Sequence, residues 1–195
     1  MSESGLAVFI NGAPGSGKST VARRLVSSRP GWFLLDVDVL RTFVGGWSAD
    51  FAGAGQITRP IVHAIIREVV GGGGVVVIPQ LLYDVDDFLG FANEADDAGG
   101  EALHVVLDVP SSECWRRLRA RLSDNSAHEV SEDSLASVLA AELERVGGER
   151  YVERVAAEIE SLRDCAIPMH SIPGENTERV LRMLEALIGR YGGRS

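Results

Sequence analysis

Hydrophobic residues gather in five short runs along the chain, and the stretches between them alternate apolar and polar residues at helical spacing. The runs cover residues 6–10, 32–35, 75–78, 103–109 and 165–172. The first, third and fourth are almost continuous Val, Ile, Leu and Phe, a composition typical of strands buried on both faces of a parallel sheet. The pattern therefore predicts five strands.

Amphipathic stretches between and after these runs predict the helices. They cover residues 17–28, 58–70, 84–98, 111–122, 132–146, 149–162 and 176–189. The glycines at 71–74 predict the end of one helix and a turn into the next strand. Strands that alternate with helices form βαβ units, so we expect an α/β fold with a doubly wound, parallel, five-stranded sheet. A length of 195 residues suits one domain that spans the whole chain, residues 1–195.

Charge and hydropathy narrow the class of partner. Acidic residues outnumber basic ones 28 to 19, for a formal charge of −9. This weighs against a nucleic-acid partner and favours a small molecule. The sequence has no apolar run long enough to cross a bilayer and its N-terminus lacks signal-peptide features, so we expect a cytoplasmic protein. Cys114 and Cys165 show no metal spacing and are expected to be core thiols, and the sequence is silent on oligomeric state.

The first predicted strand runs into the sequence NGAPGSGKST, residues 11–20, which leads into the first predicted helix. It contains the G-x-x-x-x-G-K-S pattern of a phosphate-binding loop in the required context. Backbone N–H groups of such a loop surround phosphate oxygens, and the helix adds its positive end. We expect Lys18 to reach the terminal phosphates and Ser19 to bind Mg²⁺. The candidate nucleotide-binding residues are Gly12, Ala13, Pro14, Gly15, Ser16, Gly17, Lys18, Ser19 and Thr20.

A second polar group follows the second predicted strand, where Asp36, Asp38 and Arg41 occur in the sequence DVDVLR. Neighbouring parallel strands open onto one crevice, so these side chains should face the phosphate loop. Asp38 could accept the proton of an attacking hydroxyl, Asp36 could hold a Mg²⁺-bound water or orient substrate, and Arg41 could steady the acceptor. In the alternative, structural interpretation, Asp36 is a turn residue, Asp38 caps a helix and Arg41 is its surface partner.

These two motifs resemble the start of the small P-loop kinases, a group that includes bacteriophage polynucleotide kinase, chloramphenicol phosphotransferase, shikimate and gluconate kinases and zeta-type toxins. The loop, helix, second strand and D-x-x-R are similar to polynucleotide kinase, and the D-x-D at Asp36 and Asp38 resembles shikimate kinase. The similarity is specific over residues 6–41 and architectural elsewhere. It implies a P-loop fold like that of nucleoside monophosphate kinases, a helical lid, ATP and Mg²⁺, with Asp38 as the base and Arg41 as a substrate or phosphate contact.

The basic stretch after the fourth strand is where such kinases place their lid, here about residues 117–133. Arg117 and Arg121 are four residues apart and share a helix face, where they could clamp phosphates or stack on adenine. A solvated basic face is the alternative. The resemblance also implies that Pro173 and Gly174, after the last strand, border the adenine.

The acceptor side is expected at residues 42–60. Trp47 and Arg59 there could contact a ring or a negative group, although each could equally serve packing or the surface. Gln80 ends the third strand, where many relatives carry an aspartate near Mg²⁺. It could hydrogen-bond a substrate or a Mg²⁺-bound water, or it could be structural.

Together these features predict a kinase that transfers the γ-phosphate of ATP to a hydroxyl of a small molecule, such as a sugar, cyclitol, nucleoside or antibiotic. Two alternatives stay open: a polynucleotide 5′-hydroxyl kinase, and a regulatory ATPase without a small-molecule acceptor. The acceptor itself cannot be read from the sequence.

Overall fold

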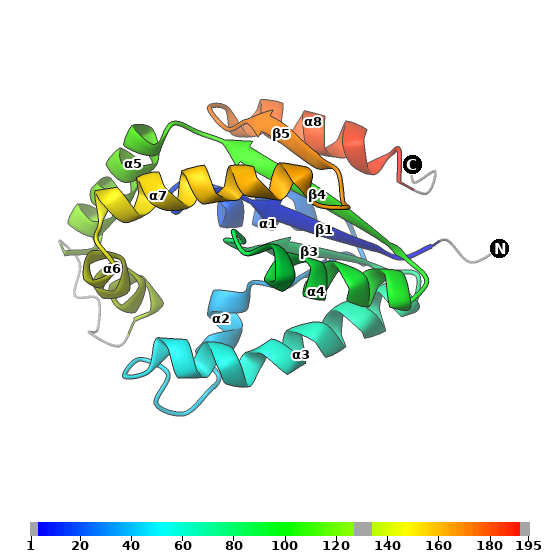
Figure 1. Cartoon of the computed structure of the whole chain (residues 1–195), viewed down its shortest axis with the longest axis horizontal. Coiled ribbons are helices and arrows are strands. Elements are labelled where there is room, and N and C mark those ends of the chain that lie inside the picture. Colours follow the sequence, from blue (N-terminus) through cyan, green and yellow to red (C-terminus); the bar gives the residue numbers. More distant parts are fainter. Residues whose placement is uncertain (1–3, 127–133, 192–195) are drawn as a thin grey trace.

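The computed structural model describes residues 4–126 and 134–191, and within them it contains one sheet of five parallel strands in the order β2-β3-β1-β4-β5 (Figure 1). The strands are β1 (Leu6–Asn11), β2 (Phe33–Leu34), β3 (Val75–Pro79), β4 (Glu101–Asp108) and β5 (Met169–Pro173). All four pairings between neighbouring strands are parallel. The predicted doubly wound sheet is confirmed, and the last strand begins at Met169 rather than at residue 165.

Helices connect the strands and agree with the predicted pattern at most boundaries. They are α1 (Lys18–Ser27), α2 (Val37–Arg41), α3 (Phe51–Gly71), α4 (Val85–Asp97), α5 (Ser111–Ser126), α6 (Leu135–Arg145), α7 (Glu149–Glu160), the 3₁₀ helix η1 (Ser161–Asp164) and α8 (Thr177–Ile188). No helix among the described residues is both long and apolar enough to cross a membrane.

One helix boundary was predicted wrongly, because α3 begins at Phe51 and not at residue 58. Its first turns contain Gly53 and Gly55, which have poor intrinsic helix propensity. A local cap and a tertiary contact override that propensity: the Asp50 side chain accepts a hydrogen bond from the Gly53 N–H at 2.8 Å, and the start of α3 packs against Arg41 of α2. Much of the region expected to be a connection is therefore helical.

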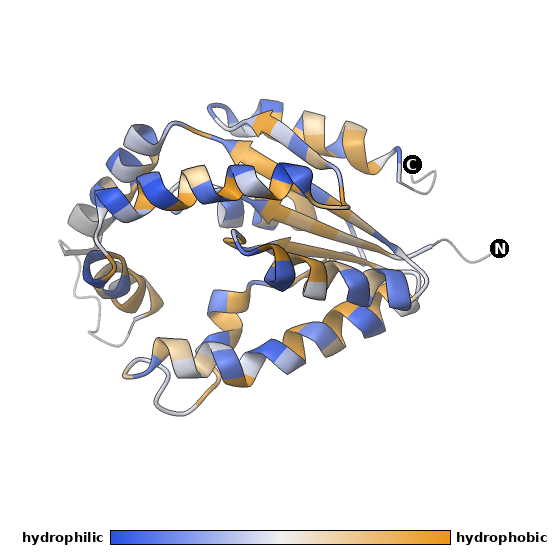
Figure 2. Cartoon of the chain, in the orientation of Figure 1, coloured by the Kyte–Doolittle hydropathy of each residue, from blue (hydrophilic) through white to orange (hydrophobic). Residues whose placement is uncertain are grey.

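Helices cover both faces of the sheet, as the continuous apolar strands predict. Leu6, Val8 and Ile10 of β1 belong to the core cluster that includes α1 and α8, whereas Ala7 and Phe9 belong to the cluster that includes α3 and α4. Every residue of β1 is buried. Figure 2 shows the strands as hydrophobic ribbons between helices of mixed hydropathy. The central strand is thus fixed on both sides, and so is the loop that follows it.

A third, smaller core lies beyond the carboxyl ends of the strands. It joins α5, α6 and α7 through residues such as Cys114, Leu143 and Val152, and it includes Ala13 of the phosphate loop. In Figure 1 α5 and α6 lie across from α2 and α3. Residues 127–133 of the predicted lid lie outside the described residues.

Candidate active site

The loop between β1 and α1 has the backbone geometry of an anion-binding site. Gly17, at the N-cap position of α1, has φ +100°, and no side chain caps the helix. The helical hydrogen-bond ladder begins where the Val21 N–H donates to the Gly17 carbonyl at 3.0 Å. The N–H groups of the preceding first turn have no helical partner, and this turn carries no acidic side chain. The helix end is therefore open to an external anion.

Two side chains of this loop, Lys18 and Ser16, carry hydrogen-bond donors. Lys18 folds back, and its Nζ donates to the carbonyls of Gly12 at 2.7 Å and Ala13 at 3.1 Å. The Ser16 Oγ is buried and makes no hydrogen bond among the described residues. Burial lowers the pKa of Lys18 to about 8, although Asp38 opposes the shift. These donors fit the oxygens of a nucleotide phosphate chain, and the contact of Lys18 with the terminal phosphates stays a prediction.

Other residues of the motif hold the loop in place. Gly15 has φ +86°, and a side-chain Cβ at this position would lie 2.3 Å from the Cys114 carbonyl oxygen. Ala13 is buried in the third core. The loop thus rests on α5, and Gly15 permits the close approach.

Asp36 and Asp38, which the sequence places in one motif, have different positions and partners in the structure. Asp36 is the N-cap of α2: its carboxylate accepts a hydrogen bond from the Val39 N–H at 3.4 Å and forms an ion pair with Arg23 at 3.1 Å. Asp38 lies in the first turn of α2, and its Oδ1 is 3.6 Å from Nη1 of Arg41. The cap expected at Asp38 in the structural interpretation is formed by Asp36 instead.

A cavity of about 730 Å³ brings the phosphate loop and these carboxylates together. Ser19, Thr20, Asp36, Asp38 and Arg121 all line it, and apolar side chains of α6 form the opposite wall. Burial raises the pKa of Asp38 above its ordinary value, and the positive charge of Arg41 opposes this rise. A carboxylate whose pKa is raised is a better proton acceptor than an ordinary aspartate.

A second, smaller cavity of about 200 Å³ lies between α2, α3, α4 and the segment after β3. Arg41, Arg59 and Gln80 line it, so the structure brings together three of the predicted substrate residues. Trp47 lines neither cavity; its ring packs against Phe51 with the centroids 6.4 Å apart.

The two arginines of α5 differ in position. Arg121 lines the larger cavity. The Nε of Arg117 instead donates to Glu113 at 2.8 Å, and Arg116 binds the same carboxylate. Hydrogen bonds from Arg116 and Arg117 lower the pKa of Glu113 to about 2. Arg117 therefore reaches a nucleotide only if it leaves this partner, whereas Arg121 already faces the cavity.

The loop after β5 is tied to the end of β4. The Gly174 N–H donates to the Asp108 carbonyl at 2.8 Å, and a Cβ on Gly174 would lie 2.3 Å from the Val109 Cγ2. Pro173 and Gly174 line neither of the two cavities. Their contact with adenine stays a prediction.

Sequence reasoning missed Asn11, the last residue of β1, which is fully buried. Its Oδ1 accepts from the N–H groups of Gly12 at 2.7 Å and Leu82 at 3.0 Å. Its Nδ2 donates to the Leu82 carbonyl at 2.6 Å and lies 3.3 Å from Nε2 of His104. One side chain therefore joins the phosphate loop to the wall of the smaller cavity, which Leu82 lines. The available signal was an asparagine ending an otherwise apolar strand.

His104 completes this buried network. Burial lowers its pKa to about 4, so the ring is neutral at physiological pH. It stacks on Phe88 with the centroids 4.3 Å apart. Because Asn11 donates to Nε2, the ring proton is on Nδ1, which is buried and makes no hydrogen bond among the described residues.

The larger cavity also contains oxygen atoms that could act as ligands of a metal ion. The described residues contain no cluster of three or more His, Cys, Asp or Glu side chains that could hold a metal alone. The Ser19 hydroxyl and the carboxylates of Asp36 and Asp38 do line one cavity with the phosphate loop. These oxygen donors fit Mg²⁺ carried by a nucleotide, because Mg²⁺ keeps several waters and phosphate ligands and needs few protein ligands.

Comparison with known families agrees with this geometry. The profile of the AAA domain family matches residues 8–144, which include the phosphate loop, both aspartates and α5. A sequence search of curated proteins finds no match.

Solved structures share the fold at low sequence identity. The tunicamycin resistance protein of Deinococcus radiodurans is 19% identical over 95% of this chain and 96% of its own, with a TM-score of 0.63. A gluconokinase from Sinorhizobium meliloti 1021 is 15% identical over 94% and 91%, with a TM-score of 0.61. Chaetomium thermophilum Kti12 in complex with ADP-AlF3 is 17% identical over 95% and 98%, with a TM-score of 0.63. These matches confirm the predicted kinase fold.

The buried amide of Asn11 yields a prediction about stability. Asn11→Ala leaves buried backbone groups of Gly12 and Leu82 without partners, at about 1–3 kcal/mol for each such group. We expect the free energy of unfolding in urea to fall by about 3 kcal/mol. Asn176→Ala is the matched control, because Asn176 caps α8 at the surface and should cost about 1 kcal/mol. Equal losses in the two variants would contradict the proposed linkage.

The lowered pKa of Lys18 yields a prediction about pH. Above pH 8 the free protein loses the Lys18 proton, and an anionic phosphate favours the protonated form. Affinity for ADP should therefore fall about tenfold between pH 7 and pH 9, with proton uptake on binding at pH 8. Isothermal titration calorimetry in buffers of different ionisation enthalpy measures both quantities. An affinity that is constant over this range would refute the assignment.

Proposed function

The chain belongs to the AAA domain family, within the small P-loop kinase superfamily, and we propose that it is an ATP-dependent phosphotransferase acting on a hydroxyl of a small molecule. In this proposal residues 1–195 form one kinase domain. The acceptor side comprises α2, the 42–50 connection and the start of α3, and the lid side comprises α5 and α6.

The observation that carries the proposal is the shared cavity of about 730 Å³. It holds Ser19 and Thr20, at the start of the helix where phosphates bind, together with Asp38, a carboxylate whose pKa is raised by burial. A phosphate donor and a proton acceptor in one space are the minimum for transfer to a hydroxyl. A protein that only senses a nucleotide needs no proton acceptor beside the phosphates.

The proposed reaction assigns each group a role. The acceptor hydroxyl oxygen attacks the γ-phosphorus of ATP, a new P–O bond forms, and the bond to the β-phosphate oxygen breaks, so that ADP leaves with the electron pair. Asp38 accepts the hydroxyl proton. Lys18 and Arg121 would stabilise the negative charge on the phosphates, and Arg41 would orient Asp38 through their ion pair.

Mg²⁺ would be held by Ser19, with Asp36 or Asp38 contacting its bound waters. When bound, it neutralises phosphate charge. Gln80 lines the smaller cavity, and as a neutral amide it is better suited to hydrogen-bond an acceptor than to balance a cation. Trp47 supports the acceptor side indirectly, through Phe51.

The acceptor is proposed to be a small molecule. Proteins of the same fold include a gluconokinase and a tunicamycin resistance protein, whose names refer to small hydroxyl compounds. The formal charge of −9 also disfavours a polynucleotide acceptor.

Asp38→Asn provides the decisive test. The variant keeps the shape of the side chain but loses the proton acceptor, so transfer should fall by about 10²–10⁴-fold while ATP binding stays within about threefold. The assay incubates protein, ATP and Mg²⁺ with pooled sugars, cyclitols, nucleosides and antibiotics, and mass spectrometry detects a gain of one phosphate.

Asp97→Asn is the matched control, because Asp97 is an exposed residue at the end of α4 and lines neither cavity. It should transfer phosphate like the unmodified protein. If Asp38→Asn also does so, Asp38 is not the base. If no compound gains phosphate while ATP is hydrolysed steadily, the chain is an ATPase, and the kinase proposal fails.

A further inference from the structure

We propose that the apolar face of α6 binds the body of the acceptor, so that the acceptor is an alcohol whose hydroxyl is attached to a hydrocarbon chain or an aromatic ring. This inference rests on the proposed function, because it names the class of the acceptor. It gives α6, which otherwise belongs to the lid side, a direct role in recognising the acceptor.

Apolar side chains of α5 and α6 line part of the larger cavity. They are Leu118, Leu135, Ala136, Leu139, Ala140 and Leu143. Every α6 residue in this lining is a leucine or an alanine. Leu135, Leu139 and Leu143 are four residues apart, so they follow one face of the helix and cover about 12 Å along its axis. The α6 wall of the cavity is therefore a continuous apolar surface.

Packing against the rest of the protein accounts for only one end of this surface. Leu143 belongs to the third core, as do Cys114 and Val152. Leu135 and Leu139 are half-buried and belong to none of the three cores that the described residues form. A single exposed leucine is common on a protein surface, but a row of them inside a cavity is typical of a ligand site. The surface therefore fits an apolar ligand.

The nucleotide does not account for this surface. Phosphates and Mg²⁺ need charged or polar partners, which α1, α2 and Arg121 of α5 supply to the same cavity. An apolar wall can also shield the transferred phosphoryl group from water, but that group is much shorter than the wall. The volume of about 730 Å³ lies within the usual range for small-molecule sites, roughly 300–1,000 Å³, so the cavity has room for a ligand body.

The position of the proposed base selects the acceptor as that ligand. Asp38 lines the larger cavity and not the smaller one. A hydroxyl that gives its proton to Asp38 lies about 2.6–3.2 Å from the carboxylate, so the carbon atoms bonded to this hydroxyl lie at the larger cavity too. Because phosphates and Mg²⁺ fill the polar side, the carbon atoms face α6. Apolar carbon atoms gain more from burial there than hydroxylated ones.

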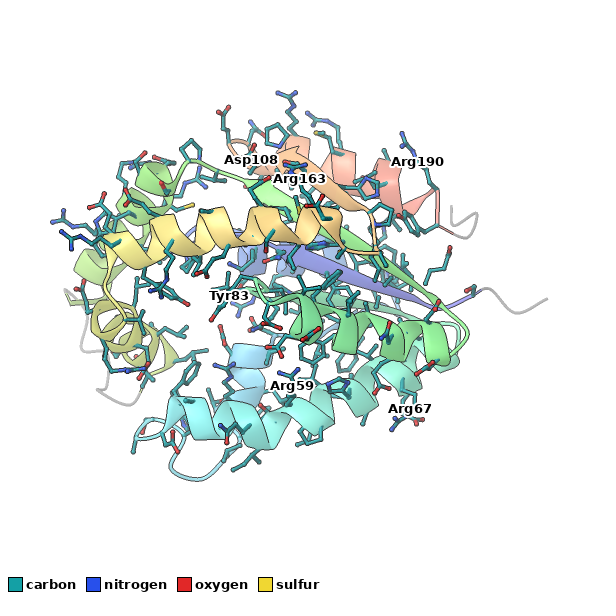
Figure 3. All side chains as sticks on the ribbon, in the orientation of Figure 1. Arg59, Arg67, Tyr83, Asp108, Arg163 and Arg190 are labelled. Atoms are coloured by element: carbon teal, nitrogen blue, oxygen red, sulfur yellow. The ribbon has the colours of Figure 1, made fainter. Side chains whose placement is uncertain are left out.

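The two cavities involve different parts of the chain. Among the described residues they share no lining residue. Figure 3 shows Arg59, which lines the smaller cavity, on α3 and well separated from α6. A substitution in the α6 surface therefore reports on the larger cavity alone.

The test uses straight-chain primary alcohols, the simplest molecules of the proposed class. Ethanol, n-propanol, n-butanol and n-hexanol are titrated into the ADP-loaded protein, with glycerol as the polar counterpart, and ligand-detected NMR measures the affinity. Each methylene group buried against α6 should strengthen binding about threefold to fourfold. We expect n-hexanol to bind at least about tenfold more tightly than n-propanol or glycerol.

Leu139→Ala removes the centre of the apolar surface and keeps a residue that favours a helix. It should weaken n-hexanol binding about threefold to tenfold, and Leu139→Asn should weaken it further, while ADP affinity stays within about twofold. Ile57→Ala and Ile57→Asn are the matched controls, because Ile57 is 58% exposed on α3 and lines neither cavity. They should bind the alcohols like the unmodified protein. Affinity that does not rise with chain length, or equal losses in the Leu139 and Ile57 variants, would overturn the inference.

Phosphate transfer separates this inference from the kinase proposal. An acceptor with an apolar body, whose KM rises in Leu139→Ala while kcat is kept, supports both. If the acceptor is fully polar, such as a cyclitol, and its KM is the same in Leu139→Ala, the kinase proposal stands and this inference fails. If Leu139→Ala removes selective n-hexanol binding but no compound gains phosphate, the apolar site stands and the kinase proposal fails.

Discussion

The Asn11 amide uses its full hydrogen-bonding capacity from a position without solvent contact, and the geometry of the site depends on it. Its oxygen fixes the first N–H of the phosphate loop and also the N–H of Leu82, while its nitrogen fixes the Leu82 carbonyl. The loop that binds phosphate and the segment that lines the smaller cavity are thus held by one side chain. Because such an amide is costly to leave unpaired, this part of the crevice has little freedom to change its spacing.

Several cationic side chains of this acidic protein line the two cavities: Arg23, Arg24 and Arg121 the larger, and Arg41 and Arg59 the smaller. Lys18 folds back onto its own loop carbonyls in a buried environment that lowers its pKa, and a phosphate would replace those carbonyls as its partner. Asp38 connects the two cavities, because it lines the larger one and forms an ion pair with Arg41, which lines the smaller one. The proposed base is therefore adjacent to both reactants.

The two sides of the crevice are packed around different cores. The sheet, α1 and α3 form a continuous packed scaffold, whereas α5, α6 and α7 are joined through a smaller core that reaches the phosphate loop at Ala13. The larger cavity is lined by residues of both parts: polar groups of α1 and α2, Arg121 of α5 and the apolar face of α6. An apolar wall can exclude water from the transferring phosphate, which helps a kinase avoid hydrolysis.

The sequence by itself determined the sheet, most helix positions, the phosphate loop and the pairing of the D-x-D-x-x-R group with it. These features depend on local signals: continuous apolar strands, helical periodicity and a glycine motif whose spacing is chemically required. Only the tertiary structure decided that Asp36 caps α2, that α3 begins at Phe51, and that Arg117 is held by Glu113 while Arg121 faces the cavity. It alone brought Asn11 to Leu82 and placed Arg41 and Arg59 on one cavity. The last two depend on contacts between residues distant in sequence, and the others on which of several nearby side chains makes a given local contact. The sequence pattern alone does not encode the outcome of either.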